Sequence, residues 1–208
     1  MTTTLEDTPS PAAIDARDRT LDERAFASRT VLVSGTITDA SASEVVRRLV
    51  ALDNESAEPI RMLVTSPGGH VESGDAIHNV VRFVAAPVTM IGNGWVGSAA
   101  THVYLAVPAA RRVCLPHTRF LIHQPSGGIG GRGTDIAIQA REILRIRERI
   151  AGIIARETGR SLDGVLADIE RDRWLSAAEA VDYGLVSRIV ERAAELDRGT
   201  GAEAGDAT

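Results

Sequence analysis

Strand-like apolar runs alternate with helical stretches between Thr30 and Ile122, and this alternation limits the folds that the chain can adopt. The runs are rich in β-branched residues and are bounded by glycine or proline, which is typical of buried strands. Alternation of this kind predicts an α/β fold with parallel strands and right-handed crossovers, in which functional sites lie at the carboxyl ends of strands. The predicted strands cover 30–33, 60–65, 88–91, 112–115 and 119–122, and the predicted helices cover 41–52, 74–84 and 99–107.

The rest of the chain is predicted to be mainly helical. Apolar residues recur at helical spacing over 134–158, a shorter helix begins at Ser161, and Ser176 to Glu179 is a capping box at the start of a third helix. A last strand is predicted at 185–190. The helix over 134–158 would be about 36 Å long at 1.5 Å per residue, so we expect part of it to pack against another subunit.

Length and composition indicate a single domain of ordinary globular type. We assign residues 21–190 to this domain, 1–20 to a flexible N-terminal arm or propeptide, and 191–208 to a disordered acidic tail. The net charge of −5 provides no basic field for nucleic acid, and no apolar run reaches the length that crosses a membrane. The start of the chain lacks the apolar core of a signal peptide, and the single cysteine, Cys114, cannot form an internal disulfide. These features predict a cytoplasmic protein.

Ser98 lies between a predicted strand and a predicted helix, in the stretch Gly94-Trp95-Val96-Gly97-Ser98-Ala99-Ala100. Backbone N–H groups at the start of a helix have no partner inside the helix, so they can stabilise a developing negative oxygen. A serine in such a turn is placed for nucleophilic attack, although most serines before helices are simple N-caps. The stretch alone leaves both interpretations open.

Two glycine-rich segments are candidates for substrate contact. Ser66-Pro67-Gly68-Gly69 is either an ordinary turn or a segment whose backbone N–H points into a site, because glycine permits conformations and close approaches that other residues do not. Ser126 to Gly133 contains five glycines in eight residues. It is either a flexible loop or an extended edge that pairs with a peptide.

A serine nucleophile needs a base, and the base needs an orienting carboxylate. His123 follows the apolar run 120–122 and is expected to emerge at a strand end. His102, one helical turn after Ser98, is a rival base, but a side chain at i+4 points along the helix. We therefore expect His102 on a helix surface or at a subunit contact, and His70 and His78 at solvent or rim positions.

The sequence does not single out the carboxylate. Asp163, Asp168, Glu170 and Asp172 lie close together, and each could equally be a solvated surface charge. Asp172 stands out only slightly, because it comes just before the apolar pair Trp174-Leu175. No set of His, Cys, Asp and Glu has convincing metal-ligand spacing, so no metal and no cofactor are expected.

Several separate motifs between Ser66 and about Val190 follow one pattern: Ser66-Pro67-Gly68-Gly69, Leu115-Pro116, Ile122-His123-Gln124-Pro125, Thr134-Asp135-Ile136, Ala140-Arg141-Glu142-Ile143-Leu144, Glu170-Arg171-Asp172-Arg173, Leu175-Ser176, Glu179-Ala180-Val181 and Tyr183-Gly184-Leu185-Val186. Over this range the chain resembles the proteolytic subunit of the caseinolytic (Clp) protease family. The resemblance implies a crotonase-like spiral of parallel strands and helices, with a protruding glycine-rich strand and long helix that form a handle over about residues 125–158.

The same resemblance assigns roles by position. It implies that Ser98 is the nucleophile, His123 the general base and Asp172 its orienter, at separations of 25 residues (98 to 123) and 49 residues (123 to 172). It implies an oxyanion hole formed by the N–H groups of Gly69 and Ala99. An extended substrate would pair as an added strand with the backbone of two segments: Gly68, Gly69, His70 and Val71, and Ser126, Gly127 and Gly128.

The resemblance also implies partners. The family assembles as two stacked heptameric rings, in which Arg173 resembles the ring–ring contact residue, and a paralogous subunit can share the rings. An AAA+ unfoldase ATPase docks on the family's rings, and Arg61 and Leu63 occupy docking positions that are often aromatic. The chain has no P-loop, so it is not itself expected to bind ATP. The expected activity is that of a serine endopeptidase acting on unfolded polypeptides or short peptides, with no nucleic-acid or membrane partner.

Two alternatives stay open at this stage. The turn around the nucleophile differs from the family's usual Gly-x-Ala-Ala-Ser-Met-Gly at Trp95, Val96, Gly97, Ala99 and Ala100. This difference is compatible with a catalytically weak, structural subunit of a mixed ring. The second alternative is an acyl-CoA enzyme of the crotonase type, which shares the spiral layout and a backbone oxyanion hole but does not need a Ser–His–Asp set.

Overall fold

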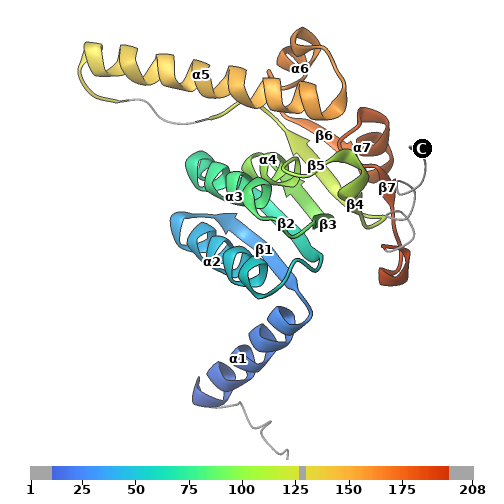
Figure 1. The fold of residues 1–208 in the computed structure, drawn as a ribbon. Coiled ribbons are helices and arrows are strands. Elements are labelled where there is room, and N and C mark those ends of the chain that lie inside the picture. Colours follow the sequence, from blue (N-terminus) through green and yellow to red (C-terminus); the bar gives the residue numbers. More distant parts are fainter. Residues whose placement is uncertain (1–10, 127–129, 197–208) are drawn as a thin grey trace, which may run out of the picture.

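Helices and strands alternate around a mainly parallel sheet (Figure 1) in the computed structural model, which describes residues 11–126 and 130–196. Within these residues the sheet has the order β1 (Thr30–Ile37), β2 (Ile60–Gly69), β3 (Val88–Gly97), β4 (Arg112–Cys114) and β7 (Arg188–Ile189). Strand β5 (Arg119–Ile122) pairs with β3 and with β6 (Arg173–Ser176). The β5–β6 pair is antiparallel, and the other pairs are parallel. The predicted α/β fold with parallel strands is confirmed.

Strand β3 has a different partner at each end. Its residues Met90–Gly92 pair with β4, whereas Trp95–Gly97 pair with β5. The two strands therefore share one edge of β3, and the carboxyl end of β3 opens toward β5 and β6. This geometry places the start of the next helix beside the end of β5.

The helices lie around the sheet, and α5 crosses one end of it (Figure 1). Their bounds are α1 (Pro11–Ala27), α2 (Asp39–Glu55), α3 (Val71–Phe83), α4 (Ala99–Tyr104), α5 (Gly133–Thr158), α6 (Leu162–Asp168) and α7 (Ala177–Tyr183), with 3₁₀ turns at Ala109–Arg111 and Ala193–Glu195.

Local sequence explains where these elements form. Side chains along β2 alternate between buried and more exposed positions, as a strand with one face on the core requires. In α3 the buried residues Ser73, Gly74, Ile77, His78 and Val81 recur every three or four positions. Helix α4 differs from the others because all six of its residues are buried. It therefore forms part of the core.

Helix α5 is partly buried and partly exposed. Its buried residues, Ala151 and Ile154, lie near its C-terminus, while Ile138 and Leu144 are 51% and 56% exposed. In Figure 1 the N-terminal part of α5 extends past the body of the molecule. Gly159 ends the helix in the left-handed region at φ 72°. The exposed leucine and isoleucine agree with the expectation that this part of α5 packs against another subunit.

The element bounds differ from the sequence expectation at several positions. Strands β2 and β3 continue to Gly69 and Gly97, because the Ser-Pro-Gly-Gly and Gly-x-x-Gly segments stay extended and paired. Strand β6 was not predicted at all. Residues 11–20, which we assigned to the N-terminal arm, belong to α1. Residues 1–10 and 197–208, and 127–129 of the glycine-rich segment, lie outside the described residues.

Candidate active site

Ser98 joins β3 to α4 in a conformation that few non-glycine residues adopt. Its φ and ψ are 54° and −123°, and such backbone strain is found chiefly at functional sites. Three backbone hydrogen bonds hold the turn: Ser98 N–H donates to the Leu121 carbonyl at 2.9 Å, and the Ser98 carbonyl accepts from Thr101 N–H at 3.0 Å and from His102 N–H at 3.2 Å. The strand, turn and helix predicted around this serine are present.

Gly68 packs directly against the Ser98 turn. A Cβ at position 68 would lie 2.6 Å from the Gly97 carbonyl oxygen, 2.7 Å from the Ser98 Cβ and 2.9 Å from the Ala99 nitrogen. These distances are shorter than real Cβ contacts allow, and Gly68 has φ 96°. Only glycine therefore lets the end of β2 approach the serine this closely.

Gly69 follows Gly68, which packs against the Ser98 turn, and Ala99 follows Ser98 directly. His70 N–H donates to the Ile37 carbonyl in β1 at 2.9 Å. Gly69 is in register with Ile37 and has φ 150°. Ala99 is the first residue of α4, so its N–H has no acceptor within the helix. This arrangement fits the predicted oxyanion hole.

His123 emerges at the end of β5, as its sequence context predicted. Its Nδ1 lies 3.6 Å from the Oδ1 of Asp172, an ion-pair distance longer than a hydrogen bond, and the Asp172 side chain is 66% exposed. Gln124 ties the two segments together, because its N–H donates to the Ile169 carbonyl at 2.7 Å and its side-chain amide donates to the Glu170 carbonyl at 2.9 Å. The Nδ1 contact leaves the Nε2 of His123 for a second partner.

Ser98 and His123 line the same hollow. Its other walls come from α4, α5 and the segment around β5, with Ala99, Thr101, His102, Ile122, Pro125, Ile150 and Ile154 among the lining residues, together with Val71. A larger and more open hollow, about 520 Å³, lies on the other side of His123 against Asp172 and Ser126. Ser98, after the end of β3, and His123, after the end of β5, therefore line one hollow, and Asp172, directly before β6, lies against His123 in the other.

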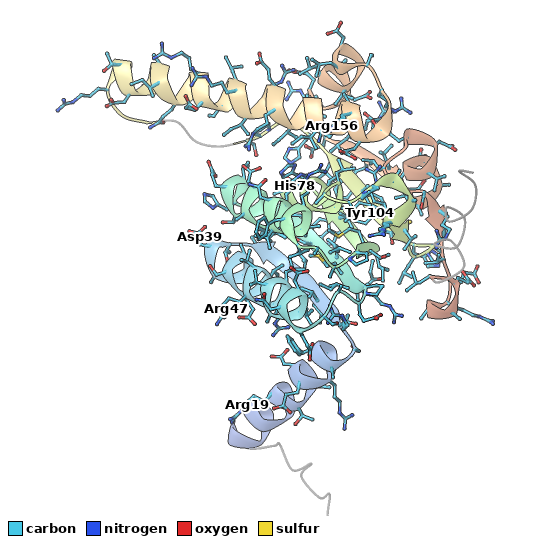
Figure 2. The ribbon with its side chains drawn as sticks, in the orientation of Figure 1. Arg19, Asp39, Arg47, His78, Tyr104 and Arg156 are labelled. Atoms are coloured by element: carbon cyan, nitrogen blue, oxygen red, sulfur yellow. The ribbon has the colours of Figure 1, made fainter. Side chains whose placement is uncertain are left out.

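A second carboxylate–imidazole pair lies in this region, and no feature of the sequence predicts it. His102 Nε2 is 2.9 Å from Asp75 Oδ1, and Arg149 of α5 donates to the other oxygen of Asp75 at 2.7 Å. The ring of His78 stacks on that of His102, with centroids 4.2 Å apart. Figure 2 labels His78 on α3, and His102, on which it stacks, belongs to α4. Both histidines are 5% exposed, so their expected positions at a surface or rim were wrong.

Among the described residues predicted to pair with substrate, Val71 and Ser126 border the site, and His70 lies next to Val71 at the start of α3. His70 precedes α3, with its Nδ1 2.7 Å from Ser73 Oγ and 3.0 Å from Asp39 Oδ1, and its Nε2 3.1 Å from Glu72. Val71 lines the hollow beside Ser98, and Ser126 lines the open one. Gly127 and Gly128 lie outside the described residues. The substrate-pairing role of all these positions remains a prediction.

The residues predicted to contact partners have clear intrachain surroundings. Arg173 pairs with Asp168, whose second oxygen accepts from the Tyr183 hydroxyl at 2.8 Å. Arg61 is exposed on β2, and Leu63 packs beside a small apolar cluster of Ile91, Val113 and Val190. The structure describes single-chain contacts alone, so these partner roles remain predictions.

Within 11–126 and 130–196, no group of three or more His, Cys, Asp or Glu side chains is placed to hold a metal ion. In the same residues, no helix combines the length and apolar character needed to cross a bilayer.

Ser98 lies in a strained turn, His123 lines the same hollow, and the Asp172 carboxylate lies against Nδ1 of His123. These residues define a site of the serine-hydrolase class on a parallel α/β fold. The family model "Clp protease" matches residues 15–193. The chain therefore belongs to the Clp protease family, as its sequence motifs indicated.

Individual relatives agree with this assignment. The chain is 50% identical over 199 residues to "ATP-dependent Clp protease proteolytic subunit 2" of Gluconobacter oxydans. This alignment covers 91% of this chain and 89% of that protein. It is 54% identical over 171 residues to "ATP-dependent Clp protease proteolytic subunit 3" of Rhizobium etli, covering 82% and 88%. Among solved structures, ClpP1 from Listeria monocytogenes matches with a TM-score of 0.77 and 41% identity over 85% of this chain and 99% of that one.

Proposed function

We propose that this chain is a serine-type endopeptidase subunit that hydrolyses peptide bonds with Ser98, His123 and Asp172. The observation that carries the proposal is the convergence of these residues. Ser98 and His123 line one hollow, and Asp172 lies against Nδ1 of His123, so Nε2 can accept the proton of the serine hydroxyl. Membership of the Clp protease family supports the reaction class.

The mechanism follows from this geometry. His123 Nε2 accepts the hydroxyl proton of Ser98 as Oγ attacks the carbonyl carbon of the scissile bond, and Asp172 stabilises the imidazolium that forms. The N–H groups of Gly69 and Ala99 donate to the oxyanion, and loss of one such donor typically costs about 3 kcal/mol of transition-state stabilisation. The imidazolium then returns its proton to the leaving amine, and water hydrolyses the acyl-serine by the same route.

Substrate binding by the backbone explains how one site could accept many sequences. An extended peptide would add a strand beside the end of β2 at Gly68 to Val71 and beside the segment from Ser126 to Gly128. Main-chain hydrogen bonds do not depend on side-chain identity. Selection of substrates would then depend mostly on which chains reach the site.

Assembly into two stacked heptameric rings would provide such restricted access. The exposed Ile138 and Leu144 on α5 support an interface there, since large apolar side chains favour burial. Arg173 would contribute to the ring–ring contact. The relatives are named as subunits of an ATP-dependent protease, so we propose that an AAA+ unfoldase docks near Arg61 and Leu63. Cytoplasmic function fits the one cysteine, Cys114, which is a buried free thiol.

Labelling with a fluorophosphonate tests the proposal, because this reagent modifies an activated serine. We expect modification at Ser98 in the wild-type protein, loss of labelling in Ser98→Ala, and hydrolysis of unstructured peptides by the wild type only. Absence of labelling in an assembled ring would favour a silent subunit of a mixed ring or an acyl-CoA enzyme. Native mass spectrometry of the same samples measures the number of subunits.

A further inference from the structure

Helix α4, which begins directly after Ser98, is held by helix α3 at two points. A Cβ on Gly74 would lie 3.2 Å from the Cβ of Ala99, so the two helices touch at the residue after the serine. Further along α4, His102 N–H donates to the Ser98 carbonyl at 3.2 Å, and the His102 carbonyl accepts from Nδ1 of His78 at 2.8 Å. The first turn of α4 is therefore fixed to α3 at both its ends.

Asp75, next to Gly74 on α3, connects this turn to helix α5. Its Oδ1 lies 2.9 Å from Nε2 of His102, and its other oxygen accepts from Arg149 of α5 at 2.7 Å. A carboxylate only accepts hydrogen bonds, so Nε2 carries the donated proton whether His102 is neutral or charged. One carboxylate thus bridges three helices, α3, α4 and α5.

The bridge is largely shielded from solvent. The side chains of His102 and Asp75 are 4% and 16% exposed, and that of Arg149, at the outer end, is 46% exposed. Burial acts to raise the pKa of Asp75, but the hydrogen bonds from His102 and Arg149 outweigh it and hold this pKa below its ordinary value. Asp75 is therefore a carboxylate at neutral pH. Removal of one partner from such a contact leaves the other partner buried and uncompensated.

Asp75 supports the walls of the catalytic hollow from behind. Among the described residues, those that line the hollow beside Ser98 include His102 and Ile150 but not Asp75. Ile150 directly follows Arg149 in α5. Loss of the bridge would shift these walls and the turn of Ser98, and a shift of about 1 Å at a reacting group can lower a rate by about a hundredfold.

We propose that Asp75 is a positioning residue, which keeps the Ser98 turn in place against α5 by bridging His102 and Arg149. This inference rests on the proposed function. Asp75 acts on the rate of attack by Ser98 and not on the binding of the peptide, because it holds the walls of the hollow without lining it. Arg149 acts through Asp75, since that carboxylate is its contact on α3.

Steady-state kinetics of one unstructured fluorogenic peptide, with the full chain in its assembled form, test this role. Asp75→Leu has a similar volume but accepts no hydrogen bond, and we expect kcat to fall about tenfold with KM unchanged. Asp75→Asn keeps one acceptor and should lose only about threefold. Exhaustive fluorophosphonate labelling counts the reactive serines, so that each kcat is expressed per active site.

Arg149 provides a second measurement. Arg149→Met should lower kcat by about threefold, and Arg149→Lys, which keeps a donor, should restore most of that loss. Asp75→Leu combined with Arg149→Met should be no slower than Asp75→Leu alone, because the contact of Arg149 is already lost. Two independent effects would instead multiply to about thirtyfold.

The matched control is Arg156→Met, the same replacement at an exposed arginine of α5 that pairs with its neighbour Glu157 (Figure 2). It should keep the wild-type kcat and KM. A wild-type kcat in Asp75→Leu, a loss that appears in KM instead, or a double variant with multiplied losses overturns the positioning role and leaves the proposed function intact.

The remaining variants decide if Asp75→Leu does not fold. Wild-type kcat in both Asp75→Asn and Arg149→Met then overturns the positioning role, whereas a loss in kcat that Arg149→Lys restores supports it. Failure of the wild type to hydrolyse the peptide overturns the proposed function itself, and this inference with it.

Discussion

A side chain on residue 68 would place its Cβ 2.7 Å from the Cβ of Ser98, so the glycine of β2 and the serine of the β3–α4 turn are in the closest contact that their backbones permit. We predict that Gly68→Ala abolishes labelling of Ser98 and lowers the melting temperature, because the methyl group must displace the Ser98 turn and because Gly68 has φ 96°. Activity-based labelling and thermal unfolding measure the two effects.

Gly152→Ala is the matched control for that replacement. A Cβ at Gly152, within α5, would meet nothing within 4 Å, and alanine favours a helix over glycine by about 1 kcal/mol. The control should keep its labelling and should melt at the same or a higher temperature. A Gly68→Ala protein that is labelled like the wild type would contradict the close contact.

Ser98 itself should be a site where function opposes stability. Its φ of 54° costs about 1–3 kcal/mol in a residue with a Cβ. We therefore expect Ser98→Gly to unfold at higher urea concentration than Ser98→Ala, by about 1 kcal/mol in the free energy of unfolding, while neither variant is labelled. Equal stability of the two variants would show that the turn carries no strain.

Replacement of His123 should lower kcat more than replacement of Asp172. His123 moves the proton, whereas Asp172 acts through it from 3.6 Å and with a side chain that is mostly exposed to solvent. We expect His123→Ala to remove measurable hydrolysis and Asp172→Asn to retain a rate higher by about a factor of a hundred. Steady-state kinetics on one peptide compare the variants, and a larger loss in Asp172→Asn would contradict the roles assigned here.

Sequence reasoning was most successful where a structure depends on neighbouring residues. The strand–helix alternation, the capping box at Ser176 and the glycine that ends α5 are local features, and each is present. Strand β6 was missed because its four residues pair antiparallel with β5, about fifty positions earlier in the chain. Short segments of this kind acquire a strand conformation from their partner and not from their own composition.

The candidate triad was accessible from motifs, but the second histidine pair was not. His102 was expected on a helix surface or at a subunit contact, because a side chain at i+4 from Ser98 points along the helix, whereas every residue of α4 is buried in the chain itself. Asp75 and Arg149 are 74 positions apart and carry no motif that links them. Buried ion pairs form between elements that tertiary packing brings together, so neither residue type nor spacing predicts them.

Acid should destabilise the fold through His78. Its pKa is lowered from 6.5 to about 4, by burial first and then by the charges of His102 and Arg82, with Asp75 acting in the opposite direction. The unfolded chain therefore binds the proton more readily, and stability is complete above pH 6.5 and falls as pH decreases toward 4. We expect about 2 kcal/mol to be lost through this group between pH 7 and pH 5.

His78→Phe separates this effect from other titrations, because phenylalanine keeps a ring on His102 and cannot be protonated. Urea unfolding at pH 7 and pH 5 should show a smaller loss of stability in His78→Phe than in the wild type. His117→Phe, at an exposed position, should lose as much as the wild type. Identical pH dependence in His78→Phe and the wild type would exclude His78 as the source.

The two tryptophans of the chain lie face to face, Trp95 on β3 and Trp174 on β6, with ring centroids 6.1 Å apart and planes 2° from parallel. Trp174 is two positions from Asp172, and Arg119 lies over its ring at 4.4 Å. The indole contribution to the intrinsic emission and near-ultraviolet circular dichroism of this protein therefore comes from one stacked pair next to the carboxylate that faces His123. Any rearrangement that separates β6 from β3 will change this optical signal. Spectroscopy can therefore follow the segment around Asp172 in the unmodified protein, with no added label.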